Sequence, residues 1–327
     1  MNRPLLSLVV VALGLLLVPG CGKDSAAEKG GGSSPKTIRL AVIPKGTTHV
    51  FWQAVEAGAK DAGRELGVEV LWKGPLKEDD RAQQIQVVQQ FIQQKVDGIA
   101  LAPLDHTALA APVAQAMKAG IPVVVFDSGL DGAPGKEFVS FVATDNTEGG
   151  RMAGRELARL LDDKGKTALL RYLVGSASTH EREEGFLSVV KSKPGLQSIA
   201  DNVYAGASAG EAKTKSLNML DKLKEADGIF ASNESATNGM LMALRQAGLA
   251  GKKKFVGFDA SPPLVEALAK GEIDALVIQN PRRMGDLAVR ALVRRLRGET
   301  VEAVVDTGAV LATRANMANP DIAPLLK

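Results

Sequence analysis

Ten short, nearly uninterrupted apolar runs are spaced along most of the chain, with helical patterns between them. They lie at residues 38–43, 68–72, 98–102, 122–127 and 138–143, and again at 168–174, 198–204, 229–232, 255–258 and 275–279. Runs that are apolar on both faces and alternate with helices are typical of parallel strands in a sheet that helices cover on both sides. Two series of five such strands predict an α/β protein with two doubly wound parallel-sheet lobes.

The segments between the strands carry apolar residues at three- and four-residue spacing, which is typical of amphipathic helices. For example, Ile85, Val88 and Phe91 share one helical face, while glutamines cover the other. The length of 327 residues also favours two lobes, because a single hydrophobic core stops growing at roughly 250–300 residues.

An uncharged apolar run over residues 5–18 follows Arg3 near the start of the chain. It is shorter than the about 20 residues of a membrane-spanning helix, so we expect a signal peptide over residues 1–20. Cys21 follows directly, in a context that resembles the lipobox of bacterial lipoproteins, which implies a lipid on its thiol. Residues 22–36 are rich in glycine and serine, so residues 21–36 predict a lipidated cysteine and a flexible tether. A soluble secreted protein and a short signal anchor are the alternatives.

Composition and motifs argue against several functional classes. A single cysteine rules out an intramolecular disulfide framework and a multi-cysteine metal site. The three histidines form no metal-spaced pair, and no phosphate-binding or dinucleotide-binding glycine motif is present. The 40 basic and 37 acidic residues are interleaved, so no nucleic-acid partner is expected. We predict no catalytic residue, no cofactor and no metal site; a serine, a histidine and an aspartate brought together from distant segments is the enzyme alternative.

Polar and aromatic side chains follow the predicted strands at their carboxyl ends, where doubly wound folds bind ligands. They are Lys45, His49, Phe51, Trp52, Asp127, Arg182, Asn233, Asp259 and Gln279. Carboxylates accept hydrogen bonds from neighbouring hydroxyls and a guanidinium donates in a fixed fork, so the set suits a polyhydroxylated ligand. Any single Asp or Asn here has a simpler interpretation as a helix cap. Because Phe51 and Trp52 are adjacent, we expect one in the core and the other facing the cleft.

The order of these motifs resembles the ribose-binding-protein family of periplasmic sugar-binding proteins, the type I solute-binding proteins of ABC importers, over residues 37–313. The stretches that carry the resemblance are Phe51-Trp52, Ile121-Pro122-Val123 before Asp127, Glu181-Arg182 with Gly185-Phe186, and Val256-Gly257-Phe258-Asp259. The resemblance implies one lobe of residues 37–144 plus 281–306, a second of 145–280 plus 307–327, and a hinge of three crossings. It also implies that Phe51, Asp127, Arg182, Asn233, Asp259 and Gln279 bind the ligand, with Trp52 beside them.

The resemblance further implies a monomeric receptor that captures a monosaccharide or related polyol and delivers it to an ABC permease. With its lipid anchor it belongs in the periplasm or cell envelope, held to a membrane. A helix-turn-helix, which repressors of this fold carry, is replaced here by the signal-like run. Presentation of the ligand to a membrane sensor is the alternative to transport.

Several positions depart from the ribose pattern and leave the sugar open. Lys45 stands where ribose binders have serine, His49 where they have asparagine, Ala102 where they have asparagine, and Ser128 where they have arginine. The Lys45 and Ser128 contexts also look like receptors for a furanose-type autoinducer. The positive charges of Lys45 and Arg182 balance two aspartates, which predicts a near-neutral ligand. The alternative hypothesis is that Lys45 binds an acidic group of the ligand. Against it, Lys45 could pair with an aspartate of the protein and orient that aspartate towards a ligand hydroxyl.

Overall fold

A computed structural model of the chain describes residues 37–326. The predicted signal peptide (1–20), the predicted lipidation site Cys21 and the predicted tether (21–36) lie outside the described residues. None of the helices within residues 37–326 is both long enough and apolar enough to cross a membrane.

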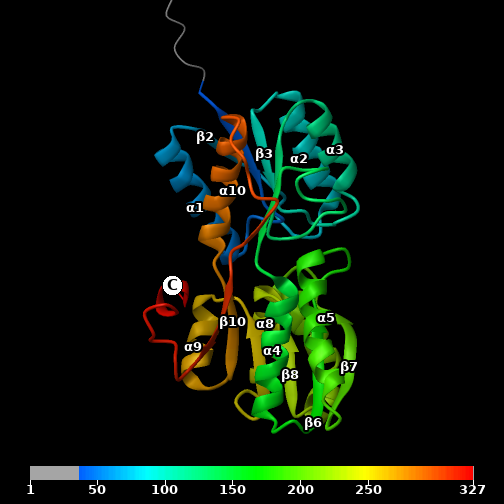
Figure 1. Ribbon diagram of the computed structural model, residues 1–327. Coiled ribbons are helices and arrows are strands. Elements are labelled where there is room, and N and C mark those ends of the chain that lie inside the picture. The colour runs from blue at the N-terminus through cyan, green and yellow to red at the C-terminus, as the bar shows by residue number, and fades with distance from the viewer. Residues whose placement is uncertain (1–36, 327) are drawn as a thin grey trace, which may run out of the picture. The chain divides into compact units, whose positions relative to one another are not determined.

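The described chain forms two six-stranded sheets (Figure 1). The first has the order β11-β5-β4-β3-β1-β2 and consists of β1 (Arg39–Ile43), β2 (Glu69–Trp72), β3 (Gly98–Leu101), β4 (Val123–Phe126), β5 (Ser140–Ala143) and β11 (Val304–Asp306). The second has the order β12-β10-β9-β8-β6-β7 and consists of β6 (Gly165–Arg171), β7 (Leu196–Tyr204), β8 (Gly228–Ala231), β9 (Lys254–Phe258), β10 (Ala275–Gln279) and β12 (Ala309–Thr313). We call each sheet with its helices a lobe.

The ten predicted strands are confirmed within a few residues at their ends, and so are the two predicted parallel-sheet lobes, with one antiparallel edge strand added to the second. Strand β12 runs antiparallel to β10, whereas the other pairs are parallel. The sequence prediction also missed β11 and β12. Both are short edge strands with half-exposed residues, so they lack the continuous apolar signal of the central strands.

Helices cover both faces of each sheet, because alternate residues of the buried strands pack in opposite directions. In β1, Leu40 and Val42 join one apolar cluster while Ala41 and Ile43 join the other. In lobe one, α1 (Val50–Leu66) and α10 (Pro281–Leu296) cover one face, and α2 (Arg81–Gln93) and α3 (Ala110–Lys118) cover the other. In lobe two, α4 (Asn146–Leu160) and α5 (Ala177–Ser192) lie opposite α6 (Ala209–Asn218), α7 (Leu220–Glu225), α8 (Glu234–Gln246) and α9 (Pro262–Lys270). A short 3₁₀ turn, η1 (Ala323–Leu326), ends the described chain.

One helix pair in each lobe packs backbone to backbone through glycines. A Cβ added to Gly58 of α1 would lie 1.9 Å from the carbonyl oxygen of Arg282 in α10. A Cβ added to Gly150 of α4 would likewise lie 1.9 Å from the carbonyl oxygen of Arg182 in α5. Such contacts admit no side chain, so both helix pairs are held at the closest approach that two backbones allow.

The chain passes between the two sheets three times, after β5, β10 and β11 (Figure 1). The first and third crossings are hydrogen-bonded to each other: Thr307 N donates to Ala143 O at 2.9 Å, and Asp145 N donates to Asp306 Oδ1 at 3.2 Å. Paired crossings of this kind permit rotation of one lobe against the other and resist sliding.

Candidate functional site

The carboxyl ends of the central strands of both lobes meet around a cavity of about 30 Å³. Its wall contains all nine residues that the sequence predicted as ligand-binding, together with Glu78, Tyr172, Ser178, Thr179 and Glu234. The structure therefore brings together predicted site residues that lie up to 234 residues apart, from Lys45 to Gln279. That these residues bind a ligand stays a prediction.

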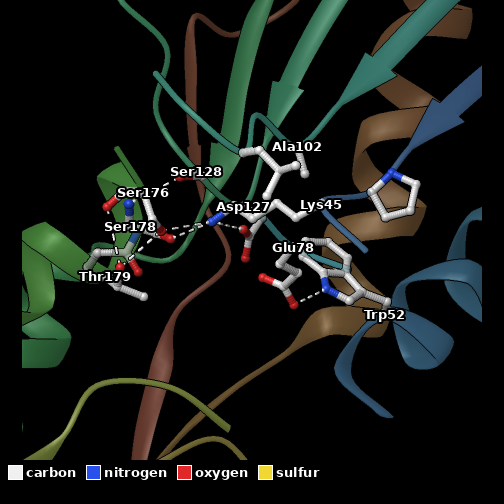
Figure 2. A network of polar contacts seen from close by, with 12 residues as sticks. Lys45, Trp52, Glu78, Ala102, Asp127, Ser128, Ser176, Ser178 and Thr179 are labelled. Atoms are coloured by element: carbon white, nitrogen blue, oxygen red, sulfur yellow. Dashed lines mark hydrogen bonds and ion pairs between the residues drawn. The ribbon is translucent and has the colours of Figure 1, made fainter. Parts of the chain in front are cut away.

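The lobe-one wall contains a hydrogen-bonded ion pair between His49 and Glu78. His49 Nδ1 lies 2.6 Å from Glu78 Oε1, and Trp52 Nε1 donates to the same oxygen at 2.7 Å (Figure 2). Burial alone would lower the pKa of His49, but its hydrogen bond to Glu78 and the charges of Glu78 and Glu234 raise that pKa to about 9. Burial opposes ionisation of Glu78, yet the hydrogen bond and charge of His49 hold the pKa of Glu78 below its usual value. The pair is therefore charged and internally neutral near pH 7.

Lys45 joins the two lobes through its ammonium group. Lys45 Nζ lies 3.2 Å from Asp127 Oδ2 and donates to Ser178 Oγ at 3.0 Å and to Ser176 Oγ at 3.3 Å, across the cleft (Figure 2). An ammonium has three N–H donors, so protein groups use all of them. A second bond between the lobes runs beside it, from Ser178 N to Ser128 Oγ at 3.1 Å. Of the two sequence-based interpretations of Lys45, this geometry favours pairing with an aspartate over binding an acidic ligand.

Arg182 organises the lobe-two wall. Its guanidinium carbon lies 3.9 Å from the centre of the Phe258 ring, and the side chain is 2% exposed. Nε donates to Asn146 Oδ1 at 2.8 Å, Nη1 to Ser232 O at 3.1 Å, and Nη2 to Gln279 Oε1 at 2.9 Å. Every partner belongs to lobe two, so this network does not depend on contact with lobe one.

Asp259 continues that network towards the cavity. It accepts from Gln279 Nε2 at 2.6 Å and from Glu234 N at 3.0 Å. Burial raises the pKa of Asp259, although the charge of Arg182 opposes the rise. Asp127 and Asp259 follow β4 and β9, the corresponding strands of the two sheets, with φ of 63° and 69°. This left-handed conformation costs a non-glycine residue roughly 1–3 kcal/mol and recurs at functional sites.

Glu234 spans the cleft from the start of α8. Its Oε2 accepts from Phe51 N in lobe one at 3.2 Å. Burial and the nearby charge of Asp259 raise the pKa of Glu234 to about 7. Phe51 is half-buried and meets Trp52 edge to face, with ring centroids 4.9 Å apart. Trp52, 2% exposed, belongs to the lobe-one core, as expected for one member of this pair.

Asn233 serves as a helix cap, which was the simpler interpretation of its position. Its Oδ1 accepts from Ala236 N at 3.1 Å at the start of α8, and its Nδ2 donates to Ser235 Oγ at 3.2 Å. The residue lines the cavity as well, so the cap fixes the position of its side chain there.

Sequence analysis missed six residues that shape the site: Glu78, Tyr172, Ser178, Thr179 and Glu234 of the cavity wall, and Gln84 behind it. Glu78 and Glu234 double the number of carboxylates in the wall, and Tyr172 adds a phenol. Gln84 contradicts the expectation that the glutamines of α2 lie on its outer face: it is fully buried, donates to Pro44 O and Ala102 O, and accepts from Leu104 N. It thereby holds together the loops that follow β1 and β3. Glu234 adjoins Asn233 at a strand end, which is a signal that sequence reasoning could have used.

Residues 40–300 match the family described as "Periplasmic binding protein domain". The ribose import binding protein of Haemophilus influenzae is 31% identical over 277 residues, which cover 84% of this chain and 90% of that protein. A carbohydrate-transporter solute-binding protein from Agrobacterium radiobacter, solved with D-arabinose, is similar with a TM-score of 0.86 and 36% identity, covering 90% of this chain and all of that one. A solute-binding protein from Agrobacterium vitis with bound D-fucose has a TM-score of 0.85 and 34% identity, covering 88% of this chain and all of that one.

Proposed function

The chain belongs to the periplasmic binding protein family, and on that premise we propose that it is the sugar-binding component of an ABC importer. Its ligand is a near-neutral monosaccharide or related polyol, held between the two lobes. The similar proteins are named for ribose import or were solved with D-arabinose or D-fucose, which supports the ligand class.

The single observation that carries the proposal is the composition of the cavity wall. Carboxylates, amides, a guanidinium and an aromatic ring from both lobes converge on one space. Charge-assisted hydrogen bonds to such groups contribute roughly 1.5–3 kcal/mol each, so a few of them give micromolar affinity. The cations Lys45 and His49 are each paired with a carboxylate. The third cation of the wall, Arg182, is offset by the nearby charge of Asp259, so no surplus positive charge is left for an anionic ligand.

Admission of the sugar requires the lobes to separate. About 30 Å³ holds roughly two water molecules, which is much less than a monosaccharide. In the proposed cycle, lobes of residues 37–144 plus 281–306 and 145–280 plus 307–327 rotate about the three crossings, admit the sugar and close around it. The site is complete within one chain, so the receptor works as a monomer.

Asp259 provides the direct test. We expect Asp259→Ala to weaken sugar binding at least tenfold, because truncation leaves ligand hydroxyls unpaired in a closed cleft. Isothermal titration with D-ribose, D-arabinose, D-allose and D-fucose measures the affinity. Asp221→Asn, which removes a nearly fully exposed carboxylate of α7, is the control. Failure of the unsubstituted protein to bind any neutral sugar in such a panel contradicts the proposed function, and unchanged affinity of Asp259→Ala contradicts the site.

The lipid anchor is a separate part of the proposal. We propose that Cys21 carries the lipid and holds the receptor at a membrane of the cell envelope. Detergent-phase partitioning of the expressed full chain tests this point. We expect the protein in the detergent phase and Cys21→Ser in the aqueous phase; equal partitioning of both would refute the anchor and leave the sugar site unaffected.

A further inference from the structure

The hydroxyl of Tyr172 is buried in the cavity wall and has no hydrogen-bond partner among the residues that the structure describes. Tyr172 follows β6 directly, is 1% exposed and lines the cleft cavity. Within residues 37–326, only its Oη and Asn146 Nδ2 are buried side-chain polar atoms without a partner, and Asn146 lies outside the cavity wall. Buried hydroxyls are hydrogen-bonded in nearly all native structures, so the phenol is positioned for a group that the protein itself does not supply.

Glu78 offers a complementary acceptor beside it. Both hydrogen bonds that Glu78 receives, from His49 and Trp52, converge on Oε1, and Oε2 receives none among the described residues. The two groups line the same cavity: burial first, then the charge and the nearby carboxylate of Glu78, raise the pKa of Tyr172 well above its ordinary value, and the approach of Ser235 opposes the rise. Neither Glu78 nor Ser235 forms a hydrogen bond with the phenol oxygen. The phenol therefore remains a donor at physiological pH, while Glu78 remains an ionised acceptor.

We propose that Tyr172 and Glu78 together recognise one hydroxyl group of the bound sugar. The Tyr172 phenol donates to the oxygen of that hydroxyl, and the hydroxyl donates its own proton to Oε2 of Glu78. This inference rests on the proposed function and adds a specificity rule to it. A hydroxyl both accepts and donates, whereas a ring oxygen or a fluorine only accepts and an ammonium only donates. Because Glu78 belongs to lobe one and Tyr172 to lobe two, the pair is assembled only when the lobes close.

Tyr172→Phe removes the hydroxyl and keeps the ring. We expect its affinity for the best-binding sugar of the D-ribose, D-arabinose, D-allose and D-fucose panel to fall roughly five- to tenfold. Tyr204→Phe is the matched control, since Tyr204 is the other tyrosine of the chain and is 41% exposed at the end of β7. Its affinity should equal that of the unsubstituted protein. An affinity of Tyr172→Phe within twofold of the unsubstituted protein would overturn the inference, while absence of any binding by the unsubstituted protein would refute the proposed function instead.

Monodeoxy and deoxyfluoro analogues of that sugar locate the hydroxyl. One deoxy analogue should bind Tyr172→Phe and the unsubstituted protein equally, because the group that the phenol contacts is already missing; the others should keep the five- to tenfold difference. A uniform loss across all analogues would overturn the inference.

The melting temperature without sugar gives an independent readout. We expect Tyr172→Phe to melt at the same temperature as the unsubstituted protein or higher, whereas a lower melting temperature would mean that the phenol has a protein partner and would overturn the inference.

Discussion

Lys45 and Tyr172 occupy the same place in the two lobes and behave in opposite ways. The helices that follow β1 and β6 begin after His49 and Ser176, whose numbers differ by 127. The strands agree, because Leu40 of β1 pairs with the first residue of β3 and Thr167 of β6 pairs with the first residue of β8, again 127 residues apart. That offset makes Lys45 equivalent to Tyr172. The Lys45 ammonium uses all three donors on protein groups, two of them in the other lobe, whereas the Tyr172 hydroxyl has no hydrogen-bond partner within residues 37–326.

Equivalent positions in the two lobes can therefore have different roles: Lys45 holds the closed lobes together, and Tyr172 is proposed to recognise the ligand. Bonds from Lys45 to Ser176 and Ser178 exist only while the lobes are together. The lobe-two network around Arg182 and Asp259 closes on itself and keeps its geometry when the lobes part. The polar network of lobe two is thus already in place before closure, whereas the bonds of Lys45 form only when the lobes close.

Removal of the Lys45 charge is the strongest way to break this comparison. We expect Lys45→Met to lower the free energy of unfolding by about 3–5 kcal/mol, because it leaves Asp127 as a buried, unpaired charge. Chemical denaturation without sugar measures the loss. Lys60→Met, which removes an exposed lysine of α1 paired with Glu56, should change the stability by less than about 1 kcal/mol. Equal losses in the two variants would show that Lys45 has no special role.

A pH titration sharpens the contrast between the charged lobe-one wall and lobe two. Because the folded-state pKa of His49 is about 9 against 6.5 in the unfolded chain, its stabilisation is complete below pH 6.5 and is lost as the pH rises to 9. The loss is on the order of 3 kcal/mol. Glu234, with a pKa raised to about 7, adds a loss of the same sign between pH 4.5 and 7. Melting temperatures against pH measure both, and His49→Asn should flatten the curve above pH 6.5; an unchanged slope in that variant would contradict the assignment.

The smallest expected effect comes from removal of the Ser178 hydroxyl, which accepts a hydrogen bond from Lys45. We expect Ser178→Ala to reduce stability by roughly 0.5–1.5 kcal/mol and to shift the sugar-free protein towards separated lobes, since the bonds of Lys45 to Asp127 and Ser176 remain. Small-angle scattering would detect the shift as a larger radius of gyration. Ser188→Ala is the control on the same helix, because Ser188 bonds only to Gly185 O one turn earlier. If both variants keep the dimensions of the unsubstituted protein, the contact does not hold the lobes together.

Sequence reasoning was most successful where the fold itself determines position. The ends of central strands meet at one edge of a sheet, so Lys45, Asp127, Asp259 and Gln279 could be grouped without a structure. Tyr172 was missed because the apolar run over residues 168–174 predicts a strand that continues through it, whereas β6 ends at Arg171. One residue of difference moves the phenol from the interior of a strand to the cavity wall.

Glu78 could not be found in the same way, for a different reason. It lies in the polar loop between β2 and α2, and its approach to His49 and Trp52 depends on how that loop folds back over the start of α1. The spacing of residues in the sequence does not predict how this loop folds back. The neighbouring residues Lys77, Asp79 and Asp80 also give the segment the composition of an ordinary solvated loop.

The glycine contact between α4 and α5 joins two backbones and involves no side chain. Gly150 meets the backbone carbonyl of Arg182, and that contact is indifferent to the side chain at position 182. The packing of α4 on α5 therefore does not depend on which side chain stands at position 182. A substitution of Arg182 would therefore remove its hydrogen bonds to Asn146, Ser232 and Gln279 and leave in place the backbone contact that positions α5.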